Sequence, residues 1–180
     1  MAQGKVAFGD NCAPCHGVGA TGFEGYPNLQ DDAWIWGGDL DAIATTIKYG
    51  IRNEYDDSRY AEMPAFGRDE LLSEEEIVQV SNYVGSLSGL PLQEGVDIEA
   101  GKVVYEENCA ACHMEDAKGD LETGSPNLLA PNYLYGKSVD KIIAQVTEPR
   151  HGVMPAWVDR LDETTRKSLA VYVHSLGGGQ

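Results

Sequence analysis

The chain has 180 residues, of which 29 are acidic and 13 are basic, and its net charge is −16 when histidine is neutral. Residues 1–90 carry 15 acids against 5 bases, and residues 91–180 carry 14 against 8. This balance argues against binding to nucleic acid or to an anionic membrane surface, and it suits a basic or dipolar protein partner.

The predicted elements are all helical, because no convincing alternating strand pattern occurs. Short apolar runs at 5–8 and 102–105 lead into the cysteine motifs described next. Residues 39–49 place apolar side chains on one face and stop at a glycine, and residues 138–146 form the counterpart. Each half closes with a longer helix. One opens with a capping box at 73–76, and the other is capped by Asp162.

All four cysteines lie in two copies of Cys-x-x-Cys-His, at residues 12–16 and 109–113. Thiols at this spacing form thioethers to both vinyl groups of one haem, and the histidine that follows presents its imidazole to the iron. The covalent residues are therefore Cys12, Cys15, Cys109 and Cys112, and the iron ligands are His16 and His113. The pattern predicts two covalently bound haem c groups.

Two other uses of the cysteines fit less well. A four-cysteine zinc site would need ligands 97 residues apart and would leave both histidines unexplained. A pair of redox-active dithiols lacks the βαβ pattern that normally surrounds such a motif.

The chain contains an internal repeat. Landmarks around the first cysteine motif recur 97 residues later, and the two Met-Pro-Ala segments, at 63–65 and 154–156, are 91 residues apart. This order predicts two tandem class I cytochrome c domains, at 1–88 and 98–180, with a linker at 89–97.

Methionine commonly binds the far side of a histidine-ligated haem c iron. Met63 and Met154 occupy equivalent places in the repeat, and a proline after each one fixes the backbone. The sequence therefore predicts Met63 as the distal ligand of the first haem and Met154 as that of the second. His151, three residues before Met154, is an alternative ligand for the second haem.

Aromatic and basic residues near these positions are candidates for the walls of the haem pockets. Trp36 and Trp157, together with Trp34 and Phe66, are candidate pocket residues. Arg52 and Arg150 precede the methionines and could pair with haem propionates. The loop at 25–29 is expected to support His16 through its backbone.

Covalent haem attachment in bacteria takes place outside the cytoplasmic membrane, so we expect a periplasmic location. The sequence shows no signal-peptide core and no apolar span of about 20 residues. By the repeat, Met1 stands where the second half has Ile98. We therefore expect a soluble fragment of a longer exported protein.

With these motifs in place, the chain resembles the dihaem cytochrome c subunit (subunit III, or P-type) of cbb3-type cytochrome c oxidases. The most specific segment is Trp34-Ile35-Trp36-Gly37-Gly38, and residues 119–128 and 152–157 are also similar. The resemblance implies a membrane-anchored subunit that is not catalytic alone. It would take electrons from a cytochrome c or a quinol-oxidising complex and pass them to the other oxidase subunits.

Three alternatives to the oxidase subunit stay open at this point. They are a free periplasmic dihaem electron-transfer cytochrome, a dihaem peroxidase and a gas sensor. The peroxidase and the gas sensor each require one iron with an open coordination position. A methionine in the equivalent place of each repeat disfavours such an open position.

Overall fold

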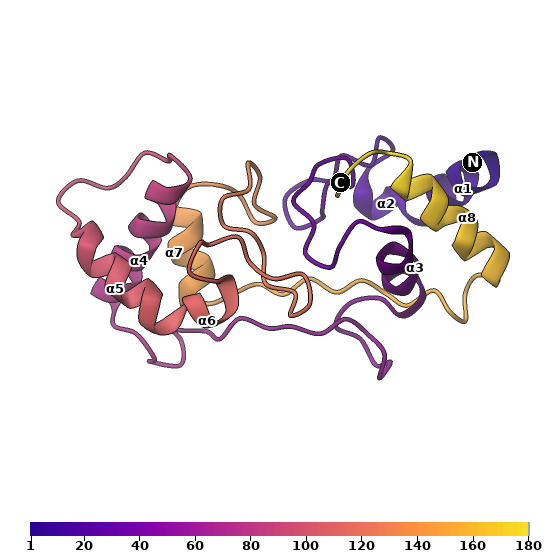
Figure 1. Cartoon of the computed structure of the whole chain (residues 1–180). Coiled ribbons are helices and arrows are strands. Elements are labelled where there is room, and N and C mark those ends of the chain that lie inside the picture. Colours follow the sequence, from indigo (N-terminus) through magenta and orange to yellow (C-terminus); the bar gives the residue numbers. More distant parts are fainter. Residues whose placement is uncertain (180) are drawn as a thin grey trace. The chain divides into compact units, whose positions relative to one another are not determined.

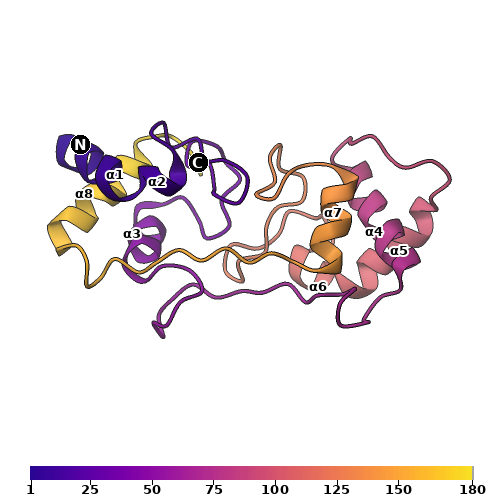
Figure 2. The ribbon, with the colours of Figure 1, turned by 180° about the vertical axis from the view of Figure 1, so that it is seen from behind.

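The computed structural model describes residues 1–179, and the regular structure in this range is helical, with isolated bridges in place of strands (Figures 1 and 2). The helices are α1 (Ala2–Asn11), α2 (Ala13–His16), α3 (Leu40–Tyr49), α4 (Glu74–Leu87), α5 (Ile98–Asn108), α6 (Ala110–His113), α7 (Val139–Thr147) and α8 (Glu163–His174). Within residues 1–179, no helix combines the length and apolar character needed to cross a membrane.

The predicted helix starts are confirmed by their capping bonds. Ser73 and Glu76 form the reciprocal capping box at the start of α4. The side chain of Asp39 caps α3, and that of Asp162 caps α8 by accepting from the amide of Thr165. Gly50 ends α3 at φ +70°, in the left-handed region that favours glycine.

The chain forms two compact units whose boundaries differ from those that the repeat predicts. Unit 1 consists of Met1–Ala61 together with the chain from Gly152 onward, and unit 2 consists of Glu62–His151. Unit 1 therefore holds α1, α2, α3 and α8, whereas unit 2 holds α4 to α7. Helix α4 closes the first repeat but lies in unit 2 with the second cysteine motif. Helix α8 closes the second repeat but lies in unit 1 with the first cysteine motif.

Each cysteine-bearing helix packs on a closing helix through a glycine. In unit 1, a Cβ added to Gly4 of α1 would clash with the backbone of Ser168 on α8, and Phe8 lies 5.4 Å from Tyr172 between ring centroids. Figures 1 and 2 both show α1 beside α8.

Unit 2 repeats this packing with α5 and α4. A Cβ added to Gly101 of α5 would clash with the backbone of Gln79 on α4, and the rings of Tyr83 and Tyr105 are 5.4 Å apart. Both crossings bring the two helix backbones close together, which only a glycine permits.

The predicted linker at 89–97 is a loop within unit 2, and it explains why the closing helices exchange. Asn82 of α4 is fully buried; its side chain accepts from the amide of Gln93 at 2.9 Å and donates to the Gln93 side chain at 3.1 Å. The Ser88 hydroxyl donates to the Leu128 carbonyl at 2.6 Å. Because a short loop joins α4 to α5, pairing these two neighbours has a low loop-closure cost. The equivalent surface of α1 is then covered by α8.

Candidate functional site

Each cysteine motif lies at a junction between two helices. Cys12 ends α1 and precedes the single turn α2, which carries Cys15 and His16. Cys109 lies in the same way between α5 and α6, which carries Cys112 and His113. In both motifs the first cysteine is half-buried and the second is exposed, and all four thiols are free. Both thiols of each motif are therefore free to bond covalently to the same planar ligand.

Both motif histidines are oriented by a carbonyl group. His16 Nδ1 donates to the Pro27 carbonyl at 3.1 Å, and His113 Nδ1 donates to that of Pro126 at 3.0 Å. With the proton on Nδ1, the Nε2 atom is left with the lone pair that binds a metal. The expectation that the loop at 25–29 supports His16 is confirmed.

Burial favours the neutral form of these imidazoles. It lowers the pKa of His16 and of His113, and the carbonyl bond opposes this shift only in part. Neutral imidazole is the form that binds iron.

Burial raises the pKa of the Cys12 and Cys109 thiols to about 11, with a smaller contribution from the second cysteine of each motif. Redox-active dithiols instead have lowered thiol pKa values, so the structure disfavours that use. Across residues 1–179, no group of three or more His, Cys, Asp or Glu side chains is placed to hold a metal ion.

The two methionines lie in the opposite units from those predicted. Met154 packs against the unit 1 core, against which Cys12 and Ala13 also pack. Met63 packs against the unit 2 core, as do Cys109 and Ala110. The structure therefore groups Met154 with the first motif and Met63 with the second, unlike the predicted pairing, and iron ligation by either methionine stays a prediction. The cause of this grouping is the exchange of closing segments, because each methionine precedes its closing helix.

His151 lies in the unit of the second motif, as its candidacy for the second haem requires. It belongs to unit 2, whereas Met154 belongs to unit 1. Its Nε2 atom accepts a hydrogen bond from the backbone amide of Met63 at 3.1 Å. The structure thus brings His151 to Met63, and ligation of the second haem by His151 stays a prediction.

The tryptophans of the predicted pockets gather in unit 1. Trp34 and Trp157 pack against the same core as Met154. The Trp157 amide donates to the carbonyls of Ile47 and Lys48 at 3.2 Å. Trp157 was predicted beside the second motif, and the exchange of segments places it with the first. Phe66 is buried in unit 2.

The two arginines proposed for propionates have backbone partners. Arg52 donates to the carbonyls of Gly152 at 2.7 Å and Ala61 at 2.8 Å. Arg150 stacks on the Tyr135 ring at 4.4 Å and donates to the Tyr135 carbonyl at 3.3 Å. A propionate contact by either arginine stays a prediction.

Sequence reasoning missed Arg59. Its guanidinium lies 5.5 Å from the ring of Trp36, and its buried Nε atom has no hydrogen-bond partner among residues 1–179. A buried donor without a partner is unusual, and an ordered water, an ion or a bound group commonly completes such a site. A signal was available in the spacing, since Arg59 lies four residues before Met63. Arg52 and Arg150 also lie shortly before a methionine, so the spacing did not single out Arg59.

Comparison with known proteins identifies the family. Residues 1–84 and 96–173 match the family described as cytochrome c oxidase, cbb3-type, subunit III, and the chain belongs to this family. It is 54% identical over 179 residues to the cbb3-type cytochrome c oxidase subunit FixP of Bradyrhizobium sp. (strain ORS 278), covering 99% of this chain and 62% of that protein. The subunit CcoP of Cereibacter sphaeroides is 49% identical over 178 residues, covering 98% and 61%.

Family membership indicates binding of haem c, and the residues of both motifs fit this group. Each motif offers two free thiols and a neutral, oriented imidazole, which is the donor set that a covalent haem requires. The chain spans about three fifths of the length of these relatives.

Proposed function

We propose that this chain is a two-haem relay for single electrons within a cbb3-type oxidase. In this proposal, haem 1 is attached to Cys12 and Cys15, and its iron is bound by His16 and Met154. Haem 2 is attached to Cys109 and Cys112, and its iron is bound by His113 and Met63. The observation that carries the proposal is the grouping of one motif with one methionine in the core of each unit.

The residues around each haem define what it can do. When bound, haem c supplies a one-electron couple between ferric and ferrous iron. A thioether ligand raises the reduction potential relative to a second imidazole, so Met154 and Met63 tune the couple as well as fill the sixth position. The filled position leaves no room for a substrate, and we infer that the chain alone is not an enzyme.

We assign each unit a class I cytochrome c fold. The support is the packing of each cysteine-bearing helix on a closing helix, through Gly4 on α8 and Gly101 on α4. In each unit, the first cysteine of one motif and one methionine pack against the same apolar core. Apolar surroundings on this side would limit the access of water to a bound haem, which favours a high reduction potential.

The partners are inferred from charge and from the relatives. Unit 1 carries 12 acids against 7 bases, a net −5, and unit 2 carries 17 against 6, a net −11. A basic or dipolar electron donor is therefore attracted more strongly to unit 2. Since the relatives are named as oxidase subunits, we propose that the acceptor is another subunit of that complex, on the periplasmic side of the membrane.

A redox titration followed in the visible spectrum tests the relay. We expect two one-electron transitions and a methionine–iron charge-transfer band from each oxidised haem. The protein should restore electron flow from reduced cytochrome c when added to oxidase that lacks this subunit. A single haem per chain, or peroxide turnover above that of free haem, would overturn the proposal.

A further inference from the structure

The chain passes between the two units twice, and both passages lie next to a methionine. It leaves unit 1 after Ala61 and returns at Gly152, so Met63 is the second residue of unit 2 and Met154 is the third residue after the return. Neither methionine is part of the helix that follows it, because α4 begins only at Glu74 and α8 only at Glu163. Other contacts must fix these two segments.

In unit 1, Arg52 bonds to the residue at which the chain leaves the unit and to the residue at which it returns. Its Nε atom donates to the Gly152 carbonyl at 2.7 Å and its Nη1 atom to the Ala61 carbonyl at 2.8 Å. These are charge-assisted bonds from a partly buried side chain, and they are stronger than neutral ones. One guanidinium thus fixes the last residue before the chain leaves unit 1 and the first after it returns.

The backbone beside Arg52 holds Met154 directly. Ile51 and Met154 exchange two backbone hydrogen bonds, at 2.9 and 3.0 Å, and the Asn53 side chain donates to the Met154 carbonyl at 3.0 Å. Arg52 itself has φ +52°, a conformation that persists in a residue other than glycine only where its surroundings hold it. The Arg52 side-chain bonds supply such a constraint.

In unit 2, the imidazole of His151 makes the corresponding contact between the two ends of the unit. The Met63 amide donates to His151 Nε2 at 3.1 Å, so His151 joins the last residue of unit 2 to its second. Because the amide is the donor, His151 acts as a neutral acceptor with its proton on Nδ1.

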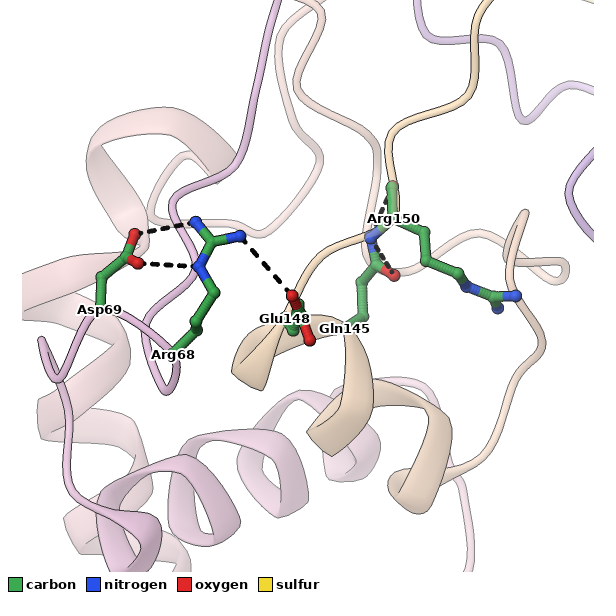
Figure 3. A network of polar contacts seen from close by, with 5 residues as sticks. All are labelled: Arg68, Asp69, Gln145, Glu148 and Arg150. Carbon is green, nitrogen blue, oxygen red and sulfur yellow. Dashed lines mark hydrogen bonds and ion pairs between the residues drawn. The ribbon is translucent and has the colours of Figure 1, made fainter.

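The chain on either side of this bond is also fixed (Figure 3). The Gln145 side chain donates to the Arg150 carbonyl at 3.1 Å and accepts from the Arg150 amide at 3.2 Å. Arg68 pairs with Asp69 at 2.9 Å and with Glu148 at 3.6 Å. The segment after Met63 and the segment before His151 are thus held together.

We propose that Arg52 and His151 are positioning residues for the distal methionines: Arg52 holds Met154 at haem 1, and His151 holds Met63 at haem 2. This inference rests on the proposed function, because it takes both methionines to be iron ligands. Neither side chain is proposed to touch the iron. Each acts on the backbone that presents the thioether.

Added imidazole competes with the methionines in the oxidised protein, and its affinity for each haem measures how firmly that methionine is held. The complete two-haem chain is used. The two haems are distinguished by the methionine methyl proton resonances of the reduced protein, assigned by their loss in Met63→Ala and in Met154→Ala. If a resonance is missing in the wild type, the methionine assignment itself fails, which separates that failure from the failure of this inference.

We expect His151→Leu to raise the imidazole affinity of haem 2 about tenfold, the factor for one hydrogen bond of ordinary strength. The imidazole affinity of haem 1 should be unchanged. His151→Gln places an amide oxygen near the former Nε2 and should return the affinity to within about twofold of wild type. His174→Leu, on α8, is the matched control.

Arg52→Met should raise the imidazole affinity of haem 1 at least tenfold and leave haem 2 unchanged, since two charge-assisted bonds are lost. Arg52→Lys, whose single ammonium cannot serve both carbonyls equally well, should give a smaller rise and carries the test if Arg52→Met does not fold. Lys167→Met removes an exposed cation from the same unit and is the control. Wild-type affinity in His151→Leu or Arg52→Lys, or a change confined to the other haem, would overturn the assignment of that residue.

Discussion

At the scale of single residues, buried polar groups fix segments that apolar packing leaves undetermined. Asn82 and Ser81 are the polar side chains found fully buried among the described residues, and Asn82 bonds to both the backbone and the side chain of Gln93. A buried amide with satisfied hydrogen bonds stabilises only the arrangement that satisfies it. Asn82 thereby specifies how the loop after α4 folds back.

We predict that Asn82→Ala lowers the free energy of unfolding of unit 2 by about 2–3 kcal/mol, because the hydrogen bonds of the buried Asn82 amide to the Gln93 backbone and side chain are lost. Chemical denaturation followed through the haem 2 absorbance measures the change. Gln79→Ala, which removes a side chain bonded only to Glu75 on the surface of the same helix, should change stability by less than about 0.5 kcal/mol. Equal effects of the two substitutions would contradict this role for Asn82.

Arg52, Met154 and His151 show where residue-level prediction from the sequence stops. Residue type and spacing predicted that the backbone of the 25–29 loop supports His16, and this contact is observed because the motif and the loop are close in sequence. Iron ligation by the two histidines stays a prediction. The same spacing paired each methionine with the motif that precedes it in the chain. The structure groups them differently, because Met63-Pro64-Ala65-Phe66 and Met154-Pro155-Ala156-Trp157 are similar in sequence and nothing in their spacing shows which unit each one joins.

At the scale of helices, the sequence predicted starts and ends well because these depend on neighbouring residues. The caps at Asp39, Ser73 and Asp162 and the stop at Gly50 are all observed. Which helices pair is a long-range property, and Gly4 and Gly101 offer equivalent surfaces. The ten-residue connection between α4 and α5 was the available signal for the pairing, but it was interpreted as a linker between domains.

The glycine crossings give a prediction for each pair of helices. Gly4→Ala should destabilise unit 1 and Gly101→Ala unit 2, each by about 1–3 kcal/mol, because the new methyl group meets backbone atoms that cannot move away. Separate haem absorbance transitions on thermal unfolding measure the two effects. Gly9→Ala, on the open face of α1, is the control and should be neutral or stabilising by about 0.5–1 kcal/mol. Destabilisation by Gly9→Ala equal to that by Gly4→Ala would contradict this account of the crossing.

The cap of α8 gives a prediction about pH. Hydrogen bonds from the Thr165 hydroxyl, then from its amide, lower the pKa of Asp162 below its ordinary value of 3.8. The capping contribution is therefore complete above the unfolded-state pKa and is lost as the pH falls through the lower, folded-state pKa. In Asp162→Asn, the cap no longer titrates. Its unfolding free energy should depend less on pH than that of wild type between about pH 5 and pH 2. Parallel pH profiles for the two proteins would rule out this contribution.

At the scale of the whole molecule, one unit is contiguous and the other is assembled from two segments. Unit 2 is a single stretch of chain, Glu62–His151, inserted into unit 1. We predict that a chain of residues 62–151 folds alone and carries one haem, with its methionine band present. A chain of residues 98–180, which the repeat would predict to be a domain, should not fold, because α5 and α8 each lack the helix on which they pack. Circular dichroism and haem content of both chains measure this, and a folded 98–180 chain with an unfolded 62–151 chain would contradict the division.

The exchange of the distal methionines is the central claim, and a variant with one haem tests it most directly. Cys12→Ala with Cys15→Ala leaves only haem 2, and Met63→Ala or Met154→Ala is then added to that protein. The methionine–iron charge-transfer band of the oxidised form is recorded. The structure predicts that Met63→Ala abolishes the band and that Met154→Ala retains it. Loss of the band in Met154→Ala, with its retention in Met63→Ala, would contradict the exchange.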